Sequence, residues 1–251
     1  MIFRWKKAKP GTVPAIFLHI QKTAGSSIVH LARQFYGSSI TSHGDCWGFP
    51  PEQFNDISFV SGHMGYDYAK HLMKKRLSFT FLRNPAERIL SMYYFCRTRD
   101  PAEFDIYKKA HELDLTHFLE AGLSDPFMRM RIWNNQVWQL AHGYTHLDER
   151  TVDDFSESDL LYLAKEHLSN FSYVGFTETF DADAAAIISR LALPKMKQIP
   201  KLNVTPKRLI AAEQPPIVRE LLSRLTVLDC QLYDYARNEL PAMQRTRWRL
   251  W

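Results

Sequence analysis

Cysteine is scarce in this sequence, and no cysteine pair has the spacing of a metal site. Cys46, Cys96 and Cys230 are odd in number and far apart, and no CxxC motif is present. The sequence therefore supports neither a disulfide framework nor a zinc site. We interpret the three residues as buried or partly buried thiols of a protein from a reducing compartment.

Long hydrophobic runs are absent as well. The longest apolar stretches have the length of a strand, and none approaches the roughly 20 residues that cross a bilayer. Residues 1–10 are basic, but the apolar core of a signal peptide does not follow them. We therefore expect a cytoplasmic protein without a membrane span, in which little precedes the fold unless an anchor has been removed.

The composition suits one domain comprising residues 1–251. Hydrophobic residues make up 45% and charged residues 24% of the chain, which allows a sizeable core and argues against disorder. The formal net charge is +5 and the pI is about 9.0, so an acidic ligand or partner is favoured. Charge alone would also allow nucleic acid, or a basic surface that serves only solubility.

Strand-like and helix-like segments alternate along the chain. Short apolar runs predict strands at residues 15–20, 57–61, 77–82 and 173–176. Helical spacing predicts helices at residues 26–36, 68–75, 85–97, 115–120, 131–142, 160–168, 181–191 and 215–239. We interpret residues 41–55 and 194–208 as loops. The alternation predicts an α/β fold: a P-loop-like parallel sheet of four to five strands, flanked by helices on both faces, with a helical elaboration.

The segment from Phe17 to Ser27 is typical of a phosphate cradle. A buried strand leads into a tight loop that contains Lys22, and a helix rich in small hydroxyl residues follows. The N–H groups and the positive dipole end of such a helix attract an anion. The alternative is a capped turn with a surface lysine.

A second strand-to-helix junction carries Arg83 and Ser91. The guanidinium of Arg83 can bind phosphate through two parallel hydrogen bonds, and Ser91 lies about two turns into the helix. An ion pair with Glu87 is the alternative for Arg83, which we assign to phosphate. For Arg88 we expect an ion pair with Glu87 or Asp100. Two anion sites, each at a strand-to-helix junction, predict a ligand with two separate phosphate groups.

Neither junction has the residues that a magnesium-dependent nucleotide site requires. In the motif GxxxxGK[ST] the lysine follows a glycine and the hydroxyl residue binds the metal, whereas here Lys22 precedes Gly25. The strand at residues 77–82 ends in Arg83 and Asn84, where a carboxylate would be expected. The sequence therefore predicts a phosphate site without a metal.

These motifs resemble those of sulfotransferases that use 3′-phosphoadenosine 5′-phosphosulfate (PAPS), above all the heparan-sulfate-2-O-type glycan sulfotransferases and their bacterial counterparts (sulfotransferase family 2). Residues 19–27 (HIQKTAGSS) resemble the 5′-phosphosulfate loop, commonly HIPKTAGTS. Residues 82–97 (LRNPAERILSMYYFCR) resemble the 3′-phosphate segment, commonly LRDPxERxxSxYYxxR. Residues 61–66 (SGHMGY) resemble the GH element of the family, residues 173–178 (YVGFTE) its VGxTE strand, and residues 202–208 (LNVTPKR) a late loop that closes over the donor.

The resemblance implies PAPS as the donor, adenosine 3′,5′-bisphosphate (PAP) as the product, and no metal. The residues that it assigns to the 5′-phosphate are Lys22, Thr23, Ala24, Gly25, Ser26 and Ser27. Those near the 3′-phosphate are Arg83 and Ser91, assisted by Thr205 and by Arg208 or Lys207. By analogy with phosphoryl transfer, Lys22 would neutralise the charge that grows on the leaving phosphate oxygen. Gln21 replaces the usual proline, which predicts a less rigid loop.

A base must take the proton of the acceptor hydroxyl, and His63 is our candidate. It follows the second predicted strand beside the cradle, and the ordinary pKa of a histidine suits proton transfer near neutral pH. His43 is the reserve candidate, in a loop that could reach the same site. His19 lies within the first strand, and we expect it to be structural.

The expected activity is transfer of a sulfuryl group to a hydroxyl of a carbohydrate acceptor, neutral or anionic. Asn134, Asn135 and Gln136 lie where relatives often place an Asn/Gln pair near the acceptor, so we assign them to that site. One alternative is a nucleotide-dependent kinase of similar architecture, which would need a metal. Another is a non-catalytic binder of anionic glycans or nucleic acid. Nucleic acid is not the expected partner, and the sequence predicts no oligomeric state.

Overall fold

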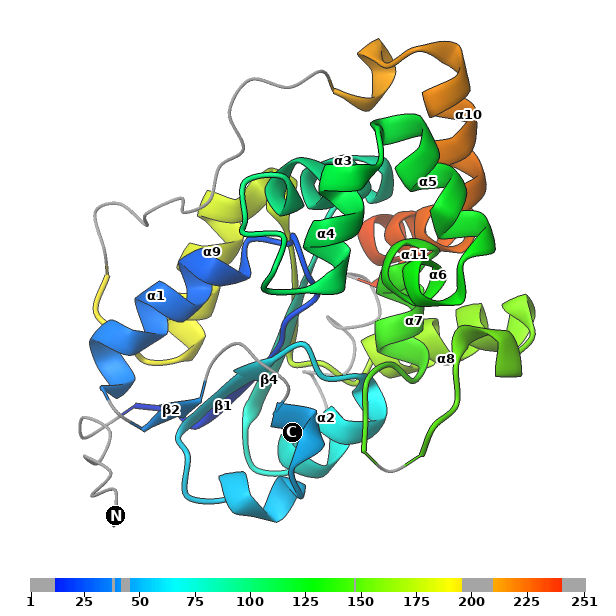
Figure 1. The fold of residues 1–251 in the computed structure, drawn as a ribbon. Coiled ribbons are helices and arrows are strands. Elements are labelled where there is room, and N and C mark those ends of the chain that lie inside the picture. Colours follow the sequence, from blue (N-terminus) through cyan, green and yellow to red (C-terminus); the bar gives the residue numbers. More distant parts are fainter. Residues whose placement is uncertain (1–11, 38, 42–45, 147, 196–209, 241–251) are drawn as a thin grey trace.

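The strands form one parallel sheet. The computed structural model describes residues 12–240 except 38, 42–45, 147 and 196–209. Within this part of the chain the strands are β1 (Ala15–Leu18), β2 (Ile40–Thr41), β3 (Phe59–Gly62), β4 (Leu77–Leu82) and β5 (Tyr173–Phe176), in the order β2-β3-β1-β4-β5 (Figure 1). Every neighbouring pair is parallel. The predicted α/β fold is confirmed, and among these strands only the two-residue β2, too short for a periodicity, was not predicted.

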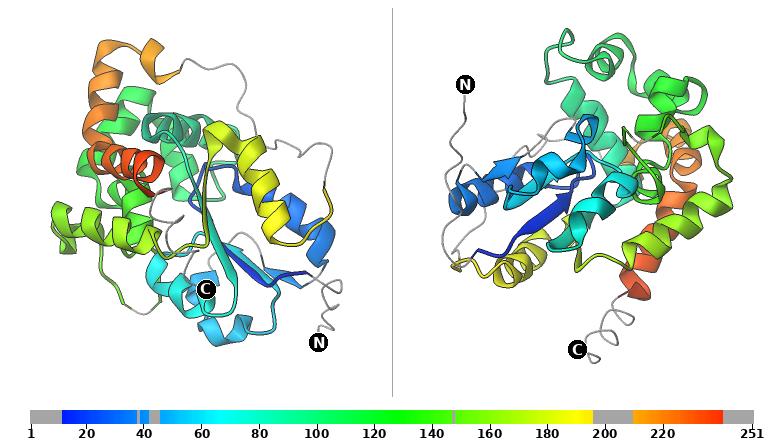
Figure 2. Two further views of the ribbon diagram at one scale, coloured as in Figure 1. Left: turned by 180° about the vertical axis from the view of Figure 1, so that it is seen from behind. Right: turned by 90° about the horizontal axis from the view of Figure 1, so that it is seen from below.

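Helices cover both faces of this sheet, as predicted. They are α1 (Gly25–Tyr36), α2 (Tyr66–Met73), α3 (Pro85–Cys96), α4 (Asp105–Glu112), α5 (Leu115–Ser124), α6 (Pro126–Ile132), α7 (Asn135–Ala141), α8 (Glu157–Leu168), α9 (Phe180–Arg190), α10 (Pro216–Leu225) and α11 (Val227–Asn238). Figure 2 shows α1 and α9 on one side of the sheet and the larger helical layer on the other. In the described part of the chain, no helix is long and apolar enough to cross a membrane.

Alternate side chains of the strands face two separate hydrophobic cores. Phe17 and Phe79 pack with α1 and α9, whereas Ile16 and Leu18 pack with α2, α3 and the other helices. This division follows from the strand geometry, in which successive side chains point to opposite faces. The sheet is therefore buried on both sides, as its near-continuous apolar strands require.

Two helices predicted as continuous are each broken in two. The segment 131–142 is divided between α6 and α7 at Asn134, whose φ is 40°, and the segment 215–239 is divided at Thr226. The two breaks stabilise each other. The Asn134 Oδ1 accepts hydrogen bonds from the N–H groups of Leu228 (2.8 Å) and Asp229 (3.0 Å) at the start of α11. The Asp229 carboxylate accepts one from Val137 N–H (2.8 Å) in the first turn of α7.

Arg88 lies inside the helical layer and does not pair with Glu87 or Asp100, so that prediction is wrong. Its side chain is fully buried, and Nη2 donates to the Ile132 carbonyl at 3.3 Å. Burial lowers the pKa of Arg88, and the charge of Asp229 opposes that shift. The apolar neighbours of Arg88 on α3 carry it into the core, where the carboxylate that acts on its pKa, Asp229, comes from a distant part of the chain.

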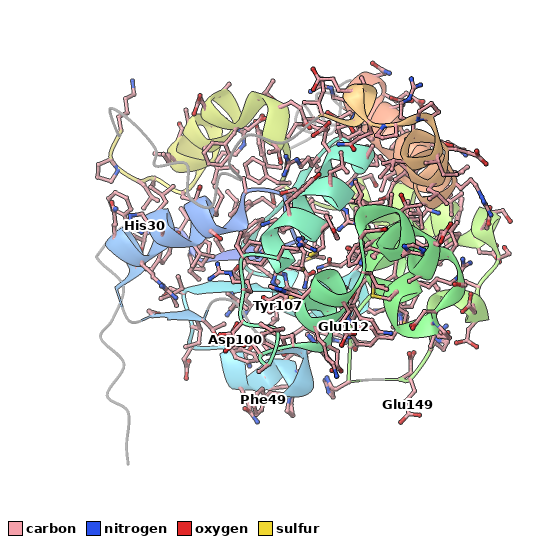
Figure 3. The ribbon with its side chains drawn as sticks, turned by 45° about the horizontal axis from the view of Figure 1, so that its top comes forward. His30, Phe49, Asp100, Tyr107, Glu112 and Glu149 are labelled. Carbon is pink, nitrogen blue, oxygen red and sulfur yellow. The ribbon has the colours of Figure 1, made fainter. Side chains whose placement is uncertain are left out.

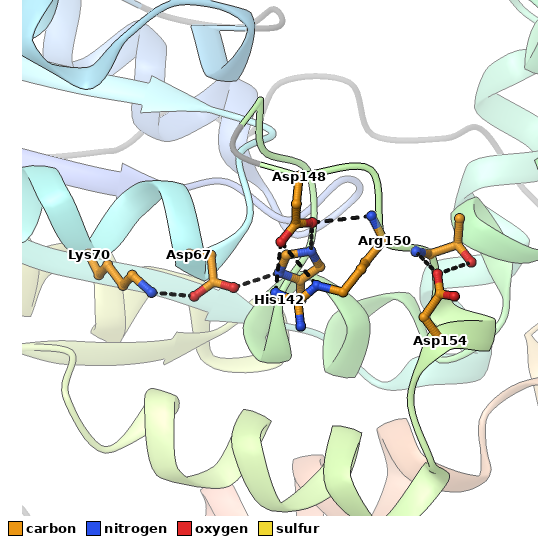
Figure 4. A network of polar contacts seen from close by, with 7 residues as sticks. Asp67, Lys70, His142, Asp148, Arg150 and Asp154 are labelled. Carbon is orange, nitrogen blue, oxygen red and sulfur yellow. Dashed lines mark hydrogen bonds and ion pairs between the residues drawn. The ribbon is translucent and has the colours of Figure 1, made fainter.

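A buried histidine ties α2 to the loop after α7. The His142 Nδ1 lies 2.6 Å from Asp67 Oδ2, and Nε2 lies 2.8 Å from Asp148 Oδ1 (Figure 4). Both ring nitrogens of His142 therefore face carboxylate oxygens, one on α2 and one on the loop after α7. Burial alone would raise the pKa of Asp67, but hydrogen bonds from His142 and Lys70 outweigh burial and lower the pKa well below its ordinary value.

We predict that His142→Ala lowers the free energy of unfolding by about 3 kcal/mol at neutral pH, because it leaves two carboxylates without their shared partner. The Asp67 pKa is depressed, so its stabilising contribution is present above the ordinary carboxylate pKa and is lost as the pH falls. The loss caused by the substitution should therefore shrink in acid. Urea denaturation at several pH values measures both effects. Lys70→Ala, which removes an exposed i,i+3 pair, is the control and should change stability by less than about 1 kcal/mol; equal losses would contradict the prediction.

Candidate active site

The predicted site residues meet at the carboxyl edge of the sheet. β1 lies between β3 and β4, so the segments that follow these three strands are neighbours. They carry Lys22, His63 and Arg83, respectively. In open parallel sheets ligands bind at this edge, outside the carboxyl ends of the strands.

The loop after β1 has a backbone suited to an anion. Lys22 and Ala24 both have a φ of 68°, in the left-handed region that side chains disfavour. Alternation of left- and right-handed residues turns successive N–H groups to one side and forms a concave anion site. No side chain caps the N-terminus of α1 at Ala24. The strained loop and the open helix end therefore both present positive charge to the same place.

Two of the predicted loop residues hold the loop itself. Thr23 is fully buried, and its hydroxyl donates to the Ile20 carbonyl at 2.8 Å. Ser27 is also buried, and its N–H donates to the Ala24 carbonyl at 3.1 Å. The Thr23 hydroxyl and the Ser27 N–H thus face inward, which corrects our assignment of these groups to the ligand. Lys22, Ala24 and Ser26 are the partly exposed residues of the cradle.

Gly25 is required because the ring of His19 lies against it. A Cβ at position 25 would lie 1.8 Å from His19 Nε2. The His19 ring is buried and stacks on Phe17 with ring centroids 5.2 Å apart. The start of α1 can therefore approach β1 this closely only without a side chain.

His63, which follows β3, is oriented by the backbone at the end of the neighbouring strand β1. Its Nδ1 lies 2.9 Å from the His19 carbonyl oxygen, which can only accept, so Nδ1 carries a proton, and in the neutral ring the lone pair is then on Nε2. The ring of His63 is tilted against that of His19, with centroids 4.5 Å apart, and it is partly exposed. This tautomer is the one that a general base at Nε2 requires.

Lys22 lies over an aromatic ring and close to other cations. Its Nζ is 3.6 Å from the centroid of Phe95, and the Arg99 guanidinium is 4.5 Å from the same centroid. Burial and the charge of Arg83 lower the pKa of Lys22 to about 8. Within the described residues no carboxylate pairs with Lys22 or Arg99. Figure 3 labels Asp100 on the loop that follows α3, and Tyr107 and Glu112 on α4.

Arg83 reaches the cradle and not Glu87. Its Nη1 donates to the Lys22 carbonyl at 3.1 Å, while the Glu87 carboxylate accepts from Ala211 N–H at 2.7 Å. Ser91 is buried two turns into α3. Asn84 caps this helix through its side chain, so it replaces an aspartate without loss of the cap. The two predicted anion sites therefore adjoin each other.

The three amides assigned to the acceptor are buried, which contradicts that assignment. Asn134, Asn135 and Gln136 are 1%, 2% and 1% exposed. Gln136 exchanges two hydrogen bonds with the backbone of Arg83, both at 3.0 Å. Three further residues at this site were not predicted: Gln139, Phe95 and Arg99. Phe95 and Arg99 lie in and just after the segment 82–97 that the motif singled out, whereas Gln139 lies in no motif.

Four further candidates fall outside the described residues: His43, Thr205, Lys207 and Arg208. Among the described residues, no group of three His, Cys, Asp or Glu side chains could hold a metal ion.

A parallel sheet whose carboxyl edge carries a lysine loop, an open helix N-terminus and an arginine is typical of α/β proteins that bind phosphate-bearing ligands. The profile of the sulfotransferase family matches residues 12–236, and the chain belongs to that family. A crystal structure of mouse sulfotransferase SULT7A1 complexed with PAP is similar, with 14% sequence identity and a TM-score of 0.47 over 91% of this chain and 90% of that chain. No curated protein sequence shows a significant match.

We predict that Gly25→Ala lowers the free energy of unfolding by about 1–3 kcal/mol, because the new methyl group collides with the packed ring of His19. Gly48→Ala is the matched control, since nothing lies within 4 Å of its Cβ position, and it should change stability by less than about 0.5 kcal/mol. Chemical denaturation measures both variants. A Gly25→Ala protein as stable as Gly48→Ala would contradict the packing described.

Proposed function

We propose that this protein transfers the sulfuryl group of PAPS to a hydroxyl group of a carbohydrate and releases PAP. The observation that carries the proposal is the contact between the two anion sites, in which Arg83 Nη1 lies 3.1 Å from the Lys22 carbonyl. One nucleotide with a phosphate at each end of its ribose matches two adjoining sites, whereas two unrelated anions would not need them together. Membership in the sulfotransferase family supports both the reaction and this donor.

In the proposed complex the cradle holds the 5′ end of the donor. The outward N–H groups around Ala24 and Gly25 and the ammonium of Lys22 bind the 5′-phosphate, while Arg83 and Ser91 bind the 3′-phosphate. Thr205 and Arg208 complete the 3′ side by resemblance to the late loop of the family. Strong hydrogen bonds to phosphate need charged or backbone donors, which these residues supply without a metal.

The proposed reaction is an in-line displacement at sulfur. His63 Nε2 takes the proton of the acceptor hydroxyl as its oxygen bonds to sulfur, and the bond between sulfur and the 5′-phosphate oxygen breaks. Lys22 leaves the face of Phe95 and neutralises the charge that develops on that phosphate oxygen. A lysine with a pKa of about 8 is still largely protonated near neutral pH, so it can play this part.

We base the proposal of a carbohydrate acceptor on the motifs that resemble those of glycan sulfotransferases. Arg99 is exposed beside Phe95 and Lys22 and has no carboxylate partner among the described residues. A cation in this place favours an acceptor that carries carboxylate or sulfate groups near the reacting hydroxyl. We therefore propose an anionic glycan as the first acceptor class to test.

The test is transfer of labelled sulfate from PAPS to a panel of glycans, lipids and phenols. We predict transfer to a glycan, a loss of at least about 100-fold in kcat for His63→Ala, and PAP affinity in that variant within about twofold of the wild type. Lys22→Ala should lower kcat far more than it weakens PAP binding. Equal losses in both would make Lys22 a docking charge only, and transfer to phenols alone would overturn the carbohydrate assignment.

A second measurement follows PAP binding by calorimetry in EDTA as the pH rises from about 7 to about 9.5. Phosphate favours the charged form of Lys22, so binding takes up a proton near the pKa of about 8. We predict that affinity falls with rising pH, by at most about tenfold per unit. Lys22→Arg stays charged in this range and should flatten the profile. Identical profiles for the two proteins would place Lys22 away from the phosphate, and absence of binding in EDTA would remove the metal-free donor site.

A further inference from the structure

Helix α7 carries two buried glutamines on one face, and both contact segments at the carboxyl edge of the sheet, which we call the active edge. Gln136 and Gln139 are three residues apart, so they lie one above the other on the helix. Their exposed fractions are 1% and 0%. Each binds backbone groups of a segment that contains a proposed active-site residue, and the two segments differ.

Gln136 holds the backbone of Arg83. The Arg83 N–H donates to Gln136 Oε1 at 3.0 Å, and Gln136 Nε2 donates to the Arg83 carbonyl at 3.0 Å. This closed pair imitates the hydrogen bonds of a neighbouring strand at a position where β4 has ended. It fixes the direction in which the Arg83 side chain leaves the sheet, toward the cradle.

Gln139 holds the surroundings of His63. Its Nε2 donates to the His19 carbonyl at 3.1 Å and to the Met64 carbonyl at 2.8 Å. The His19 carbonyl is also the group that binds His63 Nδ1, at 2.9 Å. Gln139 therefore fixes both the backbone next to His63 and the acceptor that sets its tautomer.

The helix that presents these glutamines is itself immobilised. The carboxylate of Asp229 accepts from the N–H groups of Gln136 (3.3 Å) and Val137 (2.8 Å). In the other direction, Asn134 Oδ1 accepts hydrogen bonds from two N–H groups at the start of α11. The free N–H groups of the first turn of a helix are unfavourable to bury unless they have hydrogen-bond partners such as these. A support fixed at its own N-terminus can hold two segments at a constant separation.

We propose that α7 sets the position of the donor-binding residue Arg83 relative to the base His63. Gln136 is the positioning residue of Arg83, and Gln139 is the positioning residue of His63. The inference rests on the proposed roles of those two residues. Its consequence is a division of labour: loss of Gln136 impairs donor binding, and loss of Gln139 impairs the chemical step. Two glutamines that served only to fill the core would not produce such a division.

The experiment compares Gln136→Met and Gln139→Met in the full chain. Methionine keeps the length and volume of the side chain and removes its hydrogen bonds. For Gln139→Met we expect kcat to fall at least 30-fold with the Kd for PAP within twofold of the wild type, and the acidic limb of the kcat–pH profile to move. For Gln136→Met we expect the Kd for PAP to rise at least tenfold, with kcat at saturating donor within threefold. Gln34→Met, the same change on the exposed face of α1, should leave both quantities unchanged.

Parallel losses of kcat and PAP affinity in both variants, or no loss in either, would overturn the proposal. If a methionine variant does not fold, the matching glutamate variant keeps the side-chain length and withdraws the N–H donor; absence of the expected split there also overturns it. His63→Ala distinguishes a failure of the proposed function from a failure of the inference about Gln139. If that variant retains wild-type kcat, the proposed base fails, and the role of Gln139 fails with it. If it is inactive while Gln139→Met is fully active, only the inference about Gln139 fails.

Discussion

The carbonyl oxygen of His19 is the point on which the arrangement of the active edge depends. It accepts hydrogen bonds from His63 Nδ1 and Gln139 Nε2, at 2.9 and 3.1 Å. Through this one atom the end of β1, the segment after β3 and helix α7 are joined. The ring of the same residue lies against Gly25 and sets how closely α1 approaches the sheet. A backbone carbonyl can do this because it has two lone pairs and a position fixed by the strand that precedes it.

At this edge of the sheet Lys22 and Arg99 have no carboxylate partner within the part of the chain that the structure describes. Lys22 lies near Arg83 and Arg99, and its pKa is lowered to about 8 by burial and by Arg83. The aromatic face of Phe95 provides partial compensation for Lys22 and Arg99. Elsewhere the buried ring of His142 lies between the carboxylates of Asp67 and Asp148. The contrast between the two regions is what an anion-binding site requires, because a bound anion then relieves the repulsion.

Much of the fold could be predicted because its signals are local. The apolar runs of β1, β3, β4 and β5 and the junction residues Lys22, Arg83 and His63 follow from short segments and from the rule that parallel strands end at one edge. The errors have a common cause. The breaks at Asn134 and Thr226 and the burial of Arg88 depend on partners far away in the sequence. The spacing of apolar residues along a helix is the same on either side of a break, so it does not reveal the break.

The sequence by itself determined where the proposed site residues stand, since a lysine loop, a strand-terminal arginine and a histidine after a strand are each encoded within a few positions. Only the tertiary structure decided how these residues are oriented. The tautomer of His63, the contact of Arg83 with the cradle and the clasps of Gln136 and Gln139 arise from hydrogen bonds between segments 44 to 120 residues apart. Such bonds exist only after the sheet and α7 have packed together, and no pattern within a single segment specifies them.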